Sequence, residues 1–303
     1  MAVAADLSAQ SASEPLIKSG QTRPISEHVF VILDDDVGFV PNVGIIVGSR
    51  GTLIVDTGLG ERNGRIVLDE AKKVARGAQF YLTATHFHPE HDLGATAFPD
   101  DAKMLRWVDQ QQEADELGPA TITRFAGFSN TLADFLQGAR FRAPDIVFEG
   151  NITIDLGGVR VRAFGVGPNH TRGDTAFFVP EDRVLFTGDT VMSVFPAVNA
   201  ESADLSKWMR NLDAYEALAP MQIVPAHGRM GDLALVRRYR QYFGSVTTRV
   251  RAAKSRGDTL AAAQAALANA IAEEFVDLKP SRGAPTGRIN AAIEAAYRTS
   301  HGN

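Results

Sequence analysis

The stretch ATHFHPEHDLG, residues 84–94, concentrates side chains that bind metals. His86, His88, Glu90, His91 and Asp92 fall within seven positions. Two histidines two residues apart can direct both imidazoles at one ion, and Glu90 and His91 then point to an adjacent position. The chain has no cysteine, so any metal bound here must be held by nitrogen and oxygen. Zinc accepts both ligand types, at about 2.0–2.2 Å.

Three later motifs repeat the pattern of a ligand-type residue flanked by small or turn-forming residues. They are GPNHTRGD with His170, LFTGDT with Asp189 and VPAHG with His227. Each follows an apolar run typical of a strand, and binding residues collect where strands end. Five histidines and two carboxylates are enough to hold two ions that share a bridging oxygen.

The elements that must position these residues can be read from the apolar periodicity. We predict strands at 28–34, 42–48, 52–58, 79–85, 175–180, 183–189 and 222–228, and a β-ribbon over 145–166. Helices are predicted at 64–77, 202–218 (N-capped by Ser202 or Asp204), 231–255, 259–274 and 287–298, with an irregular helical insertion at 106–140. Strands and helices interleave in both halves, which favours an α/β fold, a two-sheet sandwich flanked by helices.

HFHPEH resembles the HxHxDH signature of the metallo-β-lactamase superfamily, and the later motifs match that family's motifs in the same order. The resemblance spans about residues 28–230, with VDTG (55–58) as a further strand end typical of the family. It implies an αβ/βα four-layer sandwich over 27–230, including the insertion at 106–140. The flanking parts are predicted as a disordered or flexible tail over 1–26 and a helical C-terminal extension over 231–303, packed on the same domain.

The resemblance also implies the ligand set, which is transferred residue by residue. One zinc takes His86, His88 and His170. The second takes His91, His227 and Glu90, and Asp189 bridges the two ions. Asp56 orients ligand groups by hydrogen bonding, and Glu90 and Asp189 are the predicted catalytic carboxylates.

Position 90 departs from the family pattern, because Glu90 stands where aspartate is usual. The extra methylene moves the carboxylate oxygens by on the order of 1 Å, and misplacement on that scale can cost about a hundredfold in rate. We therefore predict two zinc ions per chain, with the second held more weakly than the first.

The predicted reaction is hydrolysis of an acyl bond by metal-bound hydroxide, since zinc lowers the pKa of bound water towards ~7. A β-lactam amide is the leading substrate. Asp189 favours the alternatives of a lactonase or a glyoxalase-type thioesterase, because the resemblance places cysteine or serine there in most true β-lactamases. A non-catalytic zinc-binding protein, with its second site disabled by Glu90, is a further alternative.

Composition restricts the partners. The net charge of −5 argues against nucleic acid, and no apolar run approaches the ~20 residues needed to cross a bilayer, so we predict a small-molecule substrate and no membrane contact. No oligomeric state is indicated. The small residues at positions 2–4 resemble the end of a signal peptide, which favours a periplasmic or exported protein over a cytoplasmic one.

Several side chains near the motifs receive individual predictions. Phe39 and Phe195 are candidates for the walls of the substrate pocket. Asp92 is expected to cap the helical turn that follows it, Asp174 to fix a turn, and Arg172 to be a solvated loop residue.

Overall fold

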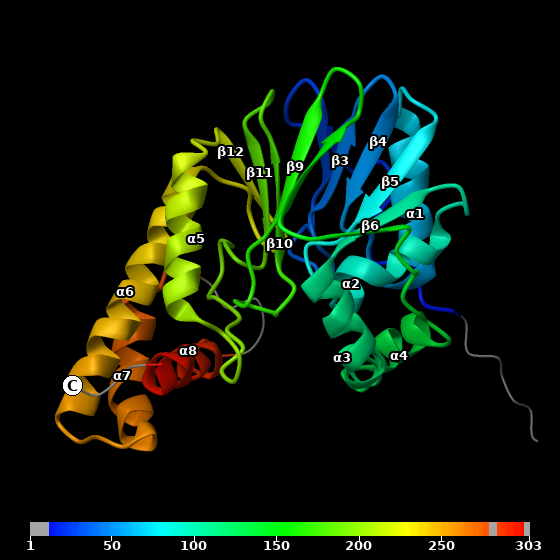
Figure 1. Cartoon of the computed structure of the whole chain (residues 1–303). Coiled ribbons are helices and arrows are strands. Elements are labelled where there is room, and N and C mark those ends of the chain that lie inside the picture. The colour runs from blue at the N-terminus through cyan, green and yellow to red at the C-terminus, as the bar shows by residue number, and fades with distance from the viewer. Residues whose placement is uncertain (1–11, 279–283, 300–303) are drawn as a thin grey trace, which may run out of the picture.

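The apolar runs of the sequence form the strands of two β-sheets that pack face to face and carry helices on their outer sides (Figure 1). The structure, a computed structural model, describes residues 12–278 and 284–299. The layers follow in the order helix, sheet, sheet, helix, which confirms the predicted αβ/βα four-layer sandwich.

Within the described residues, the first sheet has seven strands in the order β1-β2-β3-β4-β5-β6-β7. Their bounds are β1 Thr22–Pro24, β2 Val29–Ile32, β3 Val43–Val47, β4 Gly51–Val55, β5 Gln79–Thr83, β6 Lys103–Trp107 and β7 Ile146–Phe148. Pairing is antiparallel from β1 to β4 and parallel from β4 to β7. The carboxyl ends of β2, β4, β5 and β6 therefore meet at one edge.

The second sheet, again counted over the described residues, has five strands in the order β12-β11-β10-β9-β8. Their bounds are β8 Asn151–Asp155, β9 Arg160–Gly165, β10 Thr175–Val179, β11 Val184–Gly188 and β12 Gln222–Pro225. Because β9 and β11 both run antiparallel to β10, and β12 runs parallel to β11, the carboxyl ends of β9, β11 and β12 also share one edge.

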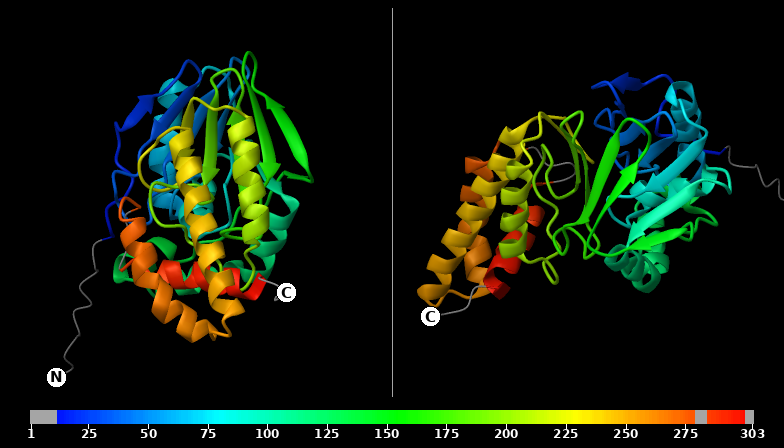
Figure 2. Two further views of the ribbon diagram at one scale, coloured as in Figure 1. Left: turned by 90° about the vertical axis from the view of Figure 1, so that its left-hand side faces the viewer. Right: turned by 45° about the horizontal axis from the view of Figure 1, so that its top comes forward.

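Helices cover the outer faces of both sheets and also lie below the strand ends (Figure 1). They are α1 Gly60–Val74, α2 Pro89–Asp92, the 3-10 helix η1 Leu93–Ala97, α3 Val108–Ala126, α4 Asn130–Leu136, α5 Leu205–Ala217, α6 Leu233–Ser255, α7 Leu260–Glu274 and α8 Thr286–Thr299. Helix α1 buries Val67, Leu68 and Ala71 against the first sheet. Helices α5 and α6 lie across the second sheet, as the left view of Figure 2 shows in yellow-green and gold. No helix in the described ranges is both long and apolar enough to span a bilayer.

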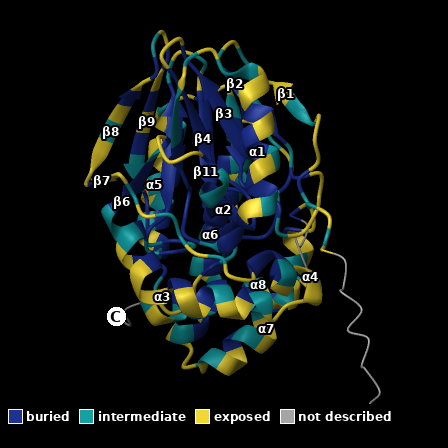
Figure 3. Ribbon diagram, turned by 90° about the vertical axis from the view of Figure 1, so that its right-hand side faces the viewer, coloured by how far each residue is buried: buried dark blue, intermediate teal, exposed yellow. Residues whose placement is uncertain are grey.

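The core between the sheets explains why the central strands are apolar on both faces. Phe177, Phe186 and Val55 lie there with at most 1% of their surface exposed. Burying a side chain of this size contributes roughly 1.5–3 kcal/mol. Figure 3 shows these strands as buried beneath the half-exposed helix α1.

The predicted tail over 1–26 is wrong for its second half. Residues 22–24 form β1, and Ile17 is buried. Side chains of α1 hold this segment: Asn63 accepts hydrogen bonds from the backbone N–H groups of Leu16 and Ile17, and Glu70 accepts one from that of Gly20. Residues 1–11, on which the prediction of an exported protein rests, lie outside the described residues.

The segment from 103 to 166 also differs in part from its prediction. The insertion predicted at 106–140 is helical, as α3 and α4, but its first two residues close strand β6, which the sequence analysis missed. Helix α3 contains Pro119 in its interior and is continuous across it. Strand β7 leaves the predicted ribbon and pairs with β6 in the first sheet, whereas β8 and β9 form a hairpin in the second.

The C-terminal helices share a core with the second sheet. Val246 of α6 and Ile293 of α8 belong to the same buried cluster as Phe178 of β10 and Leu185 of β11. The extension from residue 231 is thus packed on the sandwich.

Candidate metal centre

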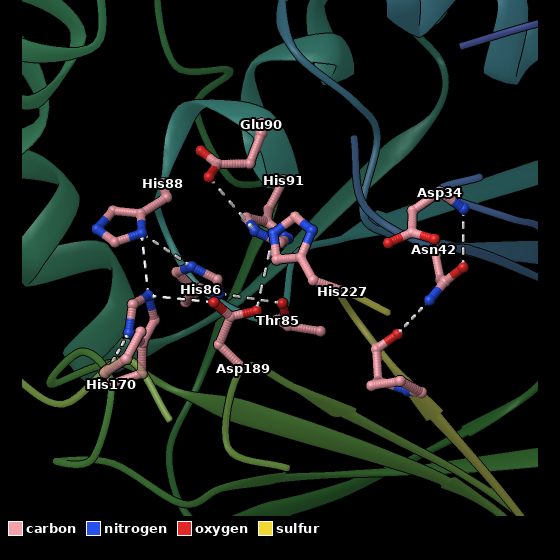
Figure 4. Close-up of polar contacts among 12 residues, drawn as sticks. Asp34, Asn42, Thr85, His86, His88, Glu90, His91, His170, Asp189 and His227 are labelled. Atoms are coloured by element: carbon pink, nitrogen blue, oxygen red, sulfur yellow. Dashed lines mark hydrogen bonds and ion pairs between the residues drawn. The ribbon is translucent and has the colours of Figure 1, made fainter. Parts of the chain in front are cut away.

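The two sheet edges that collect carboxyl strand ends face each other, and the ligand-type residues lie between them (Figure 4). The loop after β5 carries His86, His88, Glu90 and His91, and short helix α2 directs the last two inward. His170 follows β9, Asp189 follows β11 and His227 follows β12. The parallel strand directions described above are the reason why residues up to 141 positions apart converge.

Three imidazoles form the first group. His86 Nε2 lies 3.0 Å from His88 Nδ1, and His170 Nε2 lies 3.2 Å from the same atom. Two nitrogens bound to one tetrahedral zinc at about 2.05 Å stand roughly 3.3 Å apart. The spacing of this group therefore matches three ligands of a single zinc ion.

The second group consists of Glu90, His91 and His227, whose ligand atoms all lie within 4.8 Å of one another. Asp189 stands between the two groups. One of its oxygens is 3.5 Å from His170 Nε2 and the other is 3.9 Å from His227 Nε2. The structure thus brings all seven predicted ligands together, with Asp189 between the two groups.

Backbone carbonyls orient two of the histidines. His170 Nδ1 lies 2.6 Å from the carbonyl oxygen of Ala197, and His227 Nδ1 lies 3.0 Å from that of Val40. A carbonyl only accepts hydrogen bonds, so Nδ1 of each ring must carry the proton. The lone pair of each ring is then on Nε2, which faces the site, as metal ligation requires.

Asp56 orients the ligands of the loop after β5. Its carboxylate accepts hydrogen bonds from the Thr85 N–H and hydroxyl at 2.7 and 3.1 Å, and His91 Nδ1 lies 3.0 Å from Oδ2. The Thr85 hydroxyl is in turn 3.2 Å from His86 Nδ1. Asp56 has φ 63°, an unfavourable conformation for a non-glycine residue that these contacts hold in place.

The electrostatics of the histidines favour ligation. Burial and the neighbouring imidazoles lower the pKa values of His86 and His88 well below the ordinary value. Burial lowers the pKa of His227 to about 4. These three rings are therefore neutral at pH 7, with a lone pair available to an ion.

The carboxylates supply negative charge that a cation would balance. Burial opposes ionisation of Asp189, but its electrostatic interactions with the rings of His227, His170 and His91 hold its pKa below the ordinary value. Burial also opposes charge on His91, yet Asp56 and the other nearby carboxylates raise its pKa to about 9. The carboxylates around His91 thus favour a positive charge at this ring, and a bound metal ion would supply that charge in place of the proton.

Two buried polar atoms among the described residues support the same conclusion. His91 Nε2 and Asp189 Oδ1 are buried without a hydrogen-bond partner. An unpaired buried polar atom costs about 1–3 kcal/mol, so such atoms need an explanation. An ion bound between them satisfies both, and the donor set of nitrogen and oxygen is one that zinc accepts.

The two predicted pocket residues have different outcomes. Phe39 lines a cavity of about 630 Å³ beside the ligands. Phe195 does not line it: the residue is 1% exposed, and its ring centroid lies 5.9 Å from that of Tyr242 in the core of the C-terminal helices. The prediction for Phe195 is therefore wrong, because the chain after β11 turns this side chain away from the metal centre.

The neighbouring polar residues also have mixed outcomes. Asp174 fixes its turn, accepting hydrogen bonds from His170 and Thr171. Asp92 makes no capping bond; it is fully buried and binds Arg106 with both oxygens, at 2.8 and 2.9 Å. Arg172 is partly exposed but pairs with Glu116 at 2.5 Å.

Sequence reasoning missed three cavity residues, Arg124, Arg229 and Arg288. Arg124 and Arg288 lie on helices far from the ligand motifs, and Arg229 directly follows the VPAHG motif; an isolated arginine gives no local signal in either place. Thr85 was missed too, although its place directly before His86 could have marked it.

Comparison with known proteins identifies the family of the chain. The model of the family described as Metallo-beta-lactamase superfamily matches residues 36–227. Among curated proteins, a linear primary-alkylsulfatase from Pseudomonas sp. (strain ATCC 19151) is 26% identical over 217 residues, which cover 61% of this chain and 41% of the sulfatase. The acyl-coenzyme A thioesterase MBLAC2 from Homo sapiens is 25% identical over 50% of this chain and 58% of its own length. A hydroxyacylglutathione hydrolase from Hyphomonas neptunium (strain ATCC 15444) is 26% identical over 56% of this chain and 53% of its own length. The matches thus span about half the length of these relatives.

Solved structures share the fold. A metallo-beta-lactamase from Pontibacter korlensis superposes with a TM-score of 0.59 at 19% identity, covering 73% of this chain and 96% of that chain. A stereoselective inverting sec-alkylsulfatase from Pseudomonas sp. superposes with a TM-score of 0.69 at 15% identity, covering 91% of this chain and 49% of the sulfatase.

Proposed function

Because the chain belongs to the metallo-beta-lactamase superfamily, we propose that it is a metal-dependent hydrolase that binds two zinc ions. The observation that carries this proposal is the convergence of five histidines and two carboxylates in overlapping clusters, with His91 Nε2 and Asp189 Oδ1 buried without a hydrogen-bond partner among the described residues. Zinc ions, when bound, polarise the scissile bond and make water nucleophilic at neutral pH.

The residues of the chain have defined tasks in this reaction. Asp189 stays ionised and accepts a hydrogen bond from the attacking water, which fixes the direction of attack. Glu90 lines the cavity beside it and takes the proton that the water loses. His170 and His227 are held rigidly through their Nδ1 atoms, so the site does not need to reorganise during the reaction.

For the bond that is cleaved, we propose an ester or thioester ahead of the β-lactam amide expected from the sequence. The curated relatives support this order, since they are named as an alkylsulfatase, a thioesterase and a hydroxyacylglutathione hydrolase. Asp189 supports it too, because the family resemblance places aspartate there in thioesterases and lactonases. The β-lactam amide remains a candidate, and the likeness to solved β-lactamases supports only the fold.

The test is a hydrolysis panel with the purified, zinc-loaded chain. It contains an acyl-coenzyme A thioester, an alkyl sulfate, a lactone and a chromogenic cephalosporin. We expect turnover of an ester or thioester that a chelator abolishes and zinc restores. Zinc-loaded protein that turns over no member of the panel contradicts the proposal, and with one tightly bound ion it favours the non-catalytic zinc protein. Turnover of the cephalosporin alone reverses the proposed order of substrates.

A further inference from the structure

Two cavities within the described part of the chain meet beside the metal ligands. The first, of about 630 Å³, lies between the β2–β3 loop and the end of α3. The second, of about 700 Å³, lies between α3 and α8. His88, His170, Arg124 and Arg288 line both. A substrate whose reacting bond lies at the two histidines can therefore extend one part into each cavity, past both arginines.

Arg288 reaches this junction from the first turn of α8, beyond the segment that matches the family model. Its guanidinium donates a hydrogen bond to the carbonyl oxygen of Phe195, which holds the head group beside the cavity. A guanidinium has five N–H donors in a planar fork, so it can hold a carbonyl and bind an anion together. Its side chain is only partly exposed, which strengthens its interaction with an anion relative to a surface group.

Arg124 reaches the junction from the other side. Helices α3 and α8 lie on opposite sides of the space below the strand ends (Figure 1). The Arg124 guanidinium lies 5.4 Å from the ring centroid of Phe125, and the side chain is exposed. Two arginines from two separate helices therefore face the same junction, next to His88 and His170.

Acidic residues also line the cavities, and several of them form ion pairs or accept backbone hydrogen bonds elsewhere. Asp277 pairs with Arg238, and Asp34 and Glu113 accept hydrogen bonds from backbone N–H groups. Asp36 and Glu201 are exposed to solvent, which screens them. Glu90 and Asp189 line the first cavity as well, and the charge of Arg288 is one of the causes that lower the pKa of Asp189. The two arginines therefore stand beside carboxylates whose negative charge a bound metal ion would balance.

An aromatic wall, defined as Phe39, Phe125 and Phe128, adjoins the junction in the first cavity. The ring centroid of Phe39 lies 5.7 Å from the ring centroids of both Phe125 and Phe128, and those two centroids are 5.3 Å apart. Phe128 is 55% exposed, although it is large and apolar. An apolar surface left open next to a reaction centre is typical of a ligand site.

We propose, resting on the hydrolase function above, that the substrate is an amphipathic anion whose acidic group binds between Arg288 and Arg124 while its apolar part lies on the aromatic wall. A sulfate ester and a phosphate-bearing thioester share this chemistry, and hydrolysis assays distinguish them.

The experiment measures the binding of octyl sulfate and of neutral 1-octanol to the metal-free full chain by isothermal titration calorimetry. The variants are Arg288→Gln, Arg288→Lys and Arg124→Gln. Arg237→Gln is the matched control, because Arg237 lies on α6, pairs with Glu216 and lines neither cavity. Thermal unfolding of each variant checks folding, and Arg124→Gln, an exposed position, keeps the test valid if Arg288→Gln fails to fold.

For octyl sulfate, Arg288→Gln should raise Kd by roughly 10- to 100-fold, the range for a charge-assisted hydrogen bond. Arg124→Gln should raise it by up to about fivefold, as for an exposed charge pair. Arg288→Lys should recover part of the loss, and neither the control variant nor 1-octanol binding should change. Unchanged Kd values for octyl sulfate in Arg288→Gln and Arg124→Gln, or an equal loss of 1-octanol binding, would overturn the proposal.

Hydrolysis of octyl sulfate and of octanoyl-coenzyme A by the zinc-loaded chain then identifies which anion is the substrate. Turnover of one of them, with KM raised in Arg124→Gln and kcat largely kept, supports the proposal. Binding of octyl sulfate that needs both arginines, without turnover of any ester, removes the proposed hydrolase function but leaves the anion site. Turnover that is unaffected by the arginine substitutions supports the hydrolase function but removes the proposed anion site.

Discussion

Replacing Asp56 by asparagine tests how the second ion is held. In the parent chain Oδ2 of Asp56 lies 3.0 Å from His91 Nδ1, and both side chains are at most 1% exposed. Asparagine keeps one oxygen for the Thr85 N–H but turns an NH₂ group towards His91. Two donors then face each other, so His91 must move its proton to Nε2, the atom that would bind the ion.

The size of the effect follows from the contact that is lost. A buried hydrogen bond to a charged group contributes about 1.5–3 kcal/mol. Removing the partner that orients a metal-bound histidine typically weakens metal binding by about 10- to 100-fold. We therefore expect the Kd of the second zinc ion to rise by roughly 10- to 100-fold. The first ion should be affected less, because Asp56 reaches its three histidines only indirectly, through Thr85 and His86.

The assay is a titration of metal-free Asp56→Asn with zinc in competition with an indicator chelator, which resolves two binding steps. Asp92→Asn is the control, since it also changes a buried carboxylate to an amide next to the metal loop, but the partner is Arg106 and not a histidine. The control should lose stability and keep the second affinity. If Asp56→Asn binds both ions with the parent affinities, the orienting role of Asp56 is refuted.

Three further predictions concern other contacts. Glu90→Gln should lower zinc content from two ions to one, measured by elemental analysis after dialysis, because an amide is a poor zinc ligand; two retained ions would contradict the assignment of Glu90. Asp92→Ala should cost about 3–5 kcal/mol in chemical denaturation, since it leaves the buried Arg106 charge uncompensated; a loss below 1 kcal/mol would show that the pair is not needed. Burial opposes ionisation of Glu70, but its contacts with Lys73, Thr22 and Gly20 lower its pKa to about 2 from 4.5. Because the pKa in the folded state is the lower one, this stabilisation is present above pH 4.5 and is lost as pH falls towards 2. Glu70→Gln should therefore lower the free energy of unfolding by about 1–3 kcal/mol at pH 7 and leave it nearly unchanged at pH 2. An equal loss at both pH values would argue against an ionic contribution.

The residues of the candidate metal centre could be predicted from sequence because each lies in a short motif at a strand end. His86, His170, Asp189 and His227 all follow apolar runs, and the structure places all of them in one cluster. Most strands and helices were found within a few residues for the same reason, since apolar periodicity is a local signal. The N-cap of α5 is an example: Asp204 accepts a hydrogen bond from the Lys207 N–H.

Features that depend on distant partners were missed. Strand β6 has a charged residue, Arg106, at a fully buried position, and this hides its strand pattern until Asp92 is known to neutralise it. Strand β7 was predicted as part of a ribbon with the two strands that follow it, because its actual partner, β6, ends 39 residues earlier along the chain, from Trp107 to Ile146. Arg288 is a single residue on a helix that follows the last motif by about 60 positions, and only the packing of α8 brings it to the cavity.

The most direct test of the two-metal centre is an anomalous difference map at the zinc absorption edge, from crystals of the full chain grown with zinc. The account predicts two peaks, one among His86, His88 and His170 and the other among Glu90, His91 and His227, with Asp189 between them. A single peak, or peaks outside these residues, would contradict it.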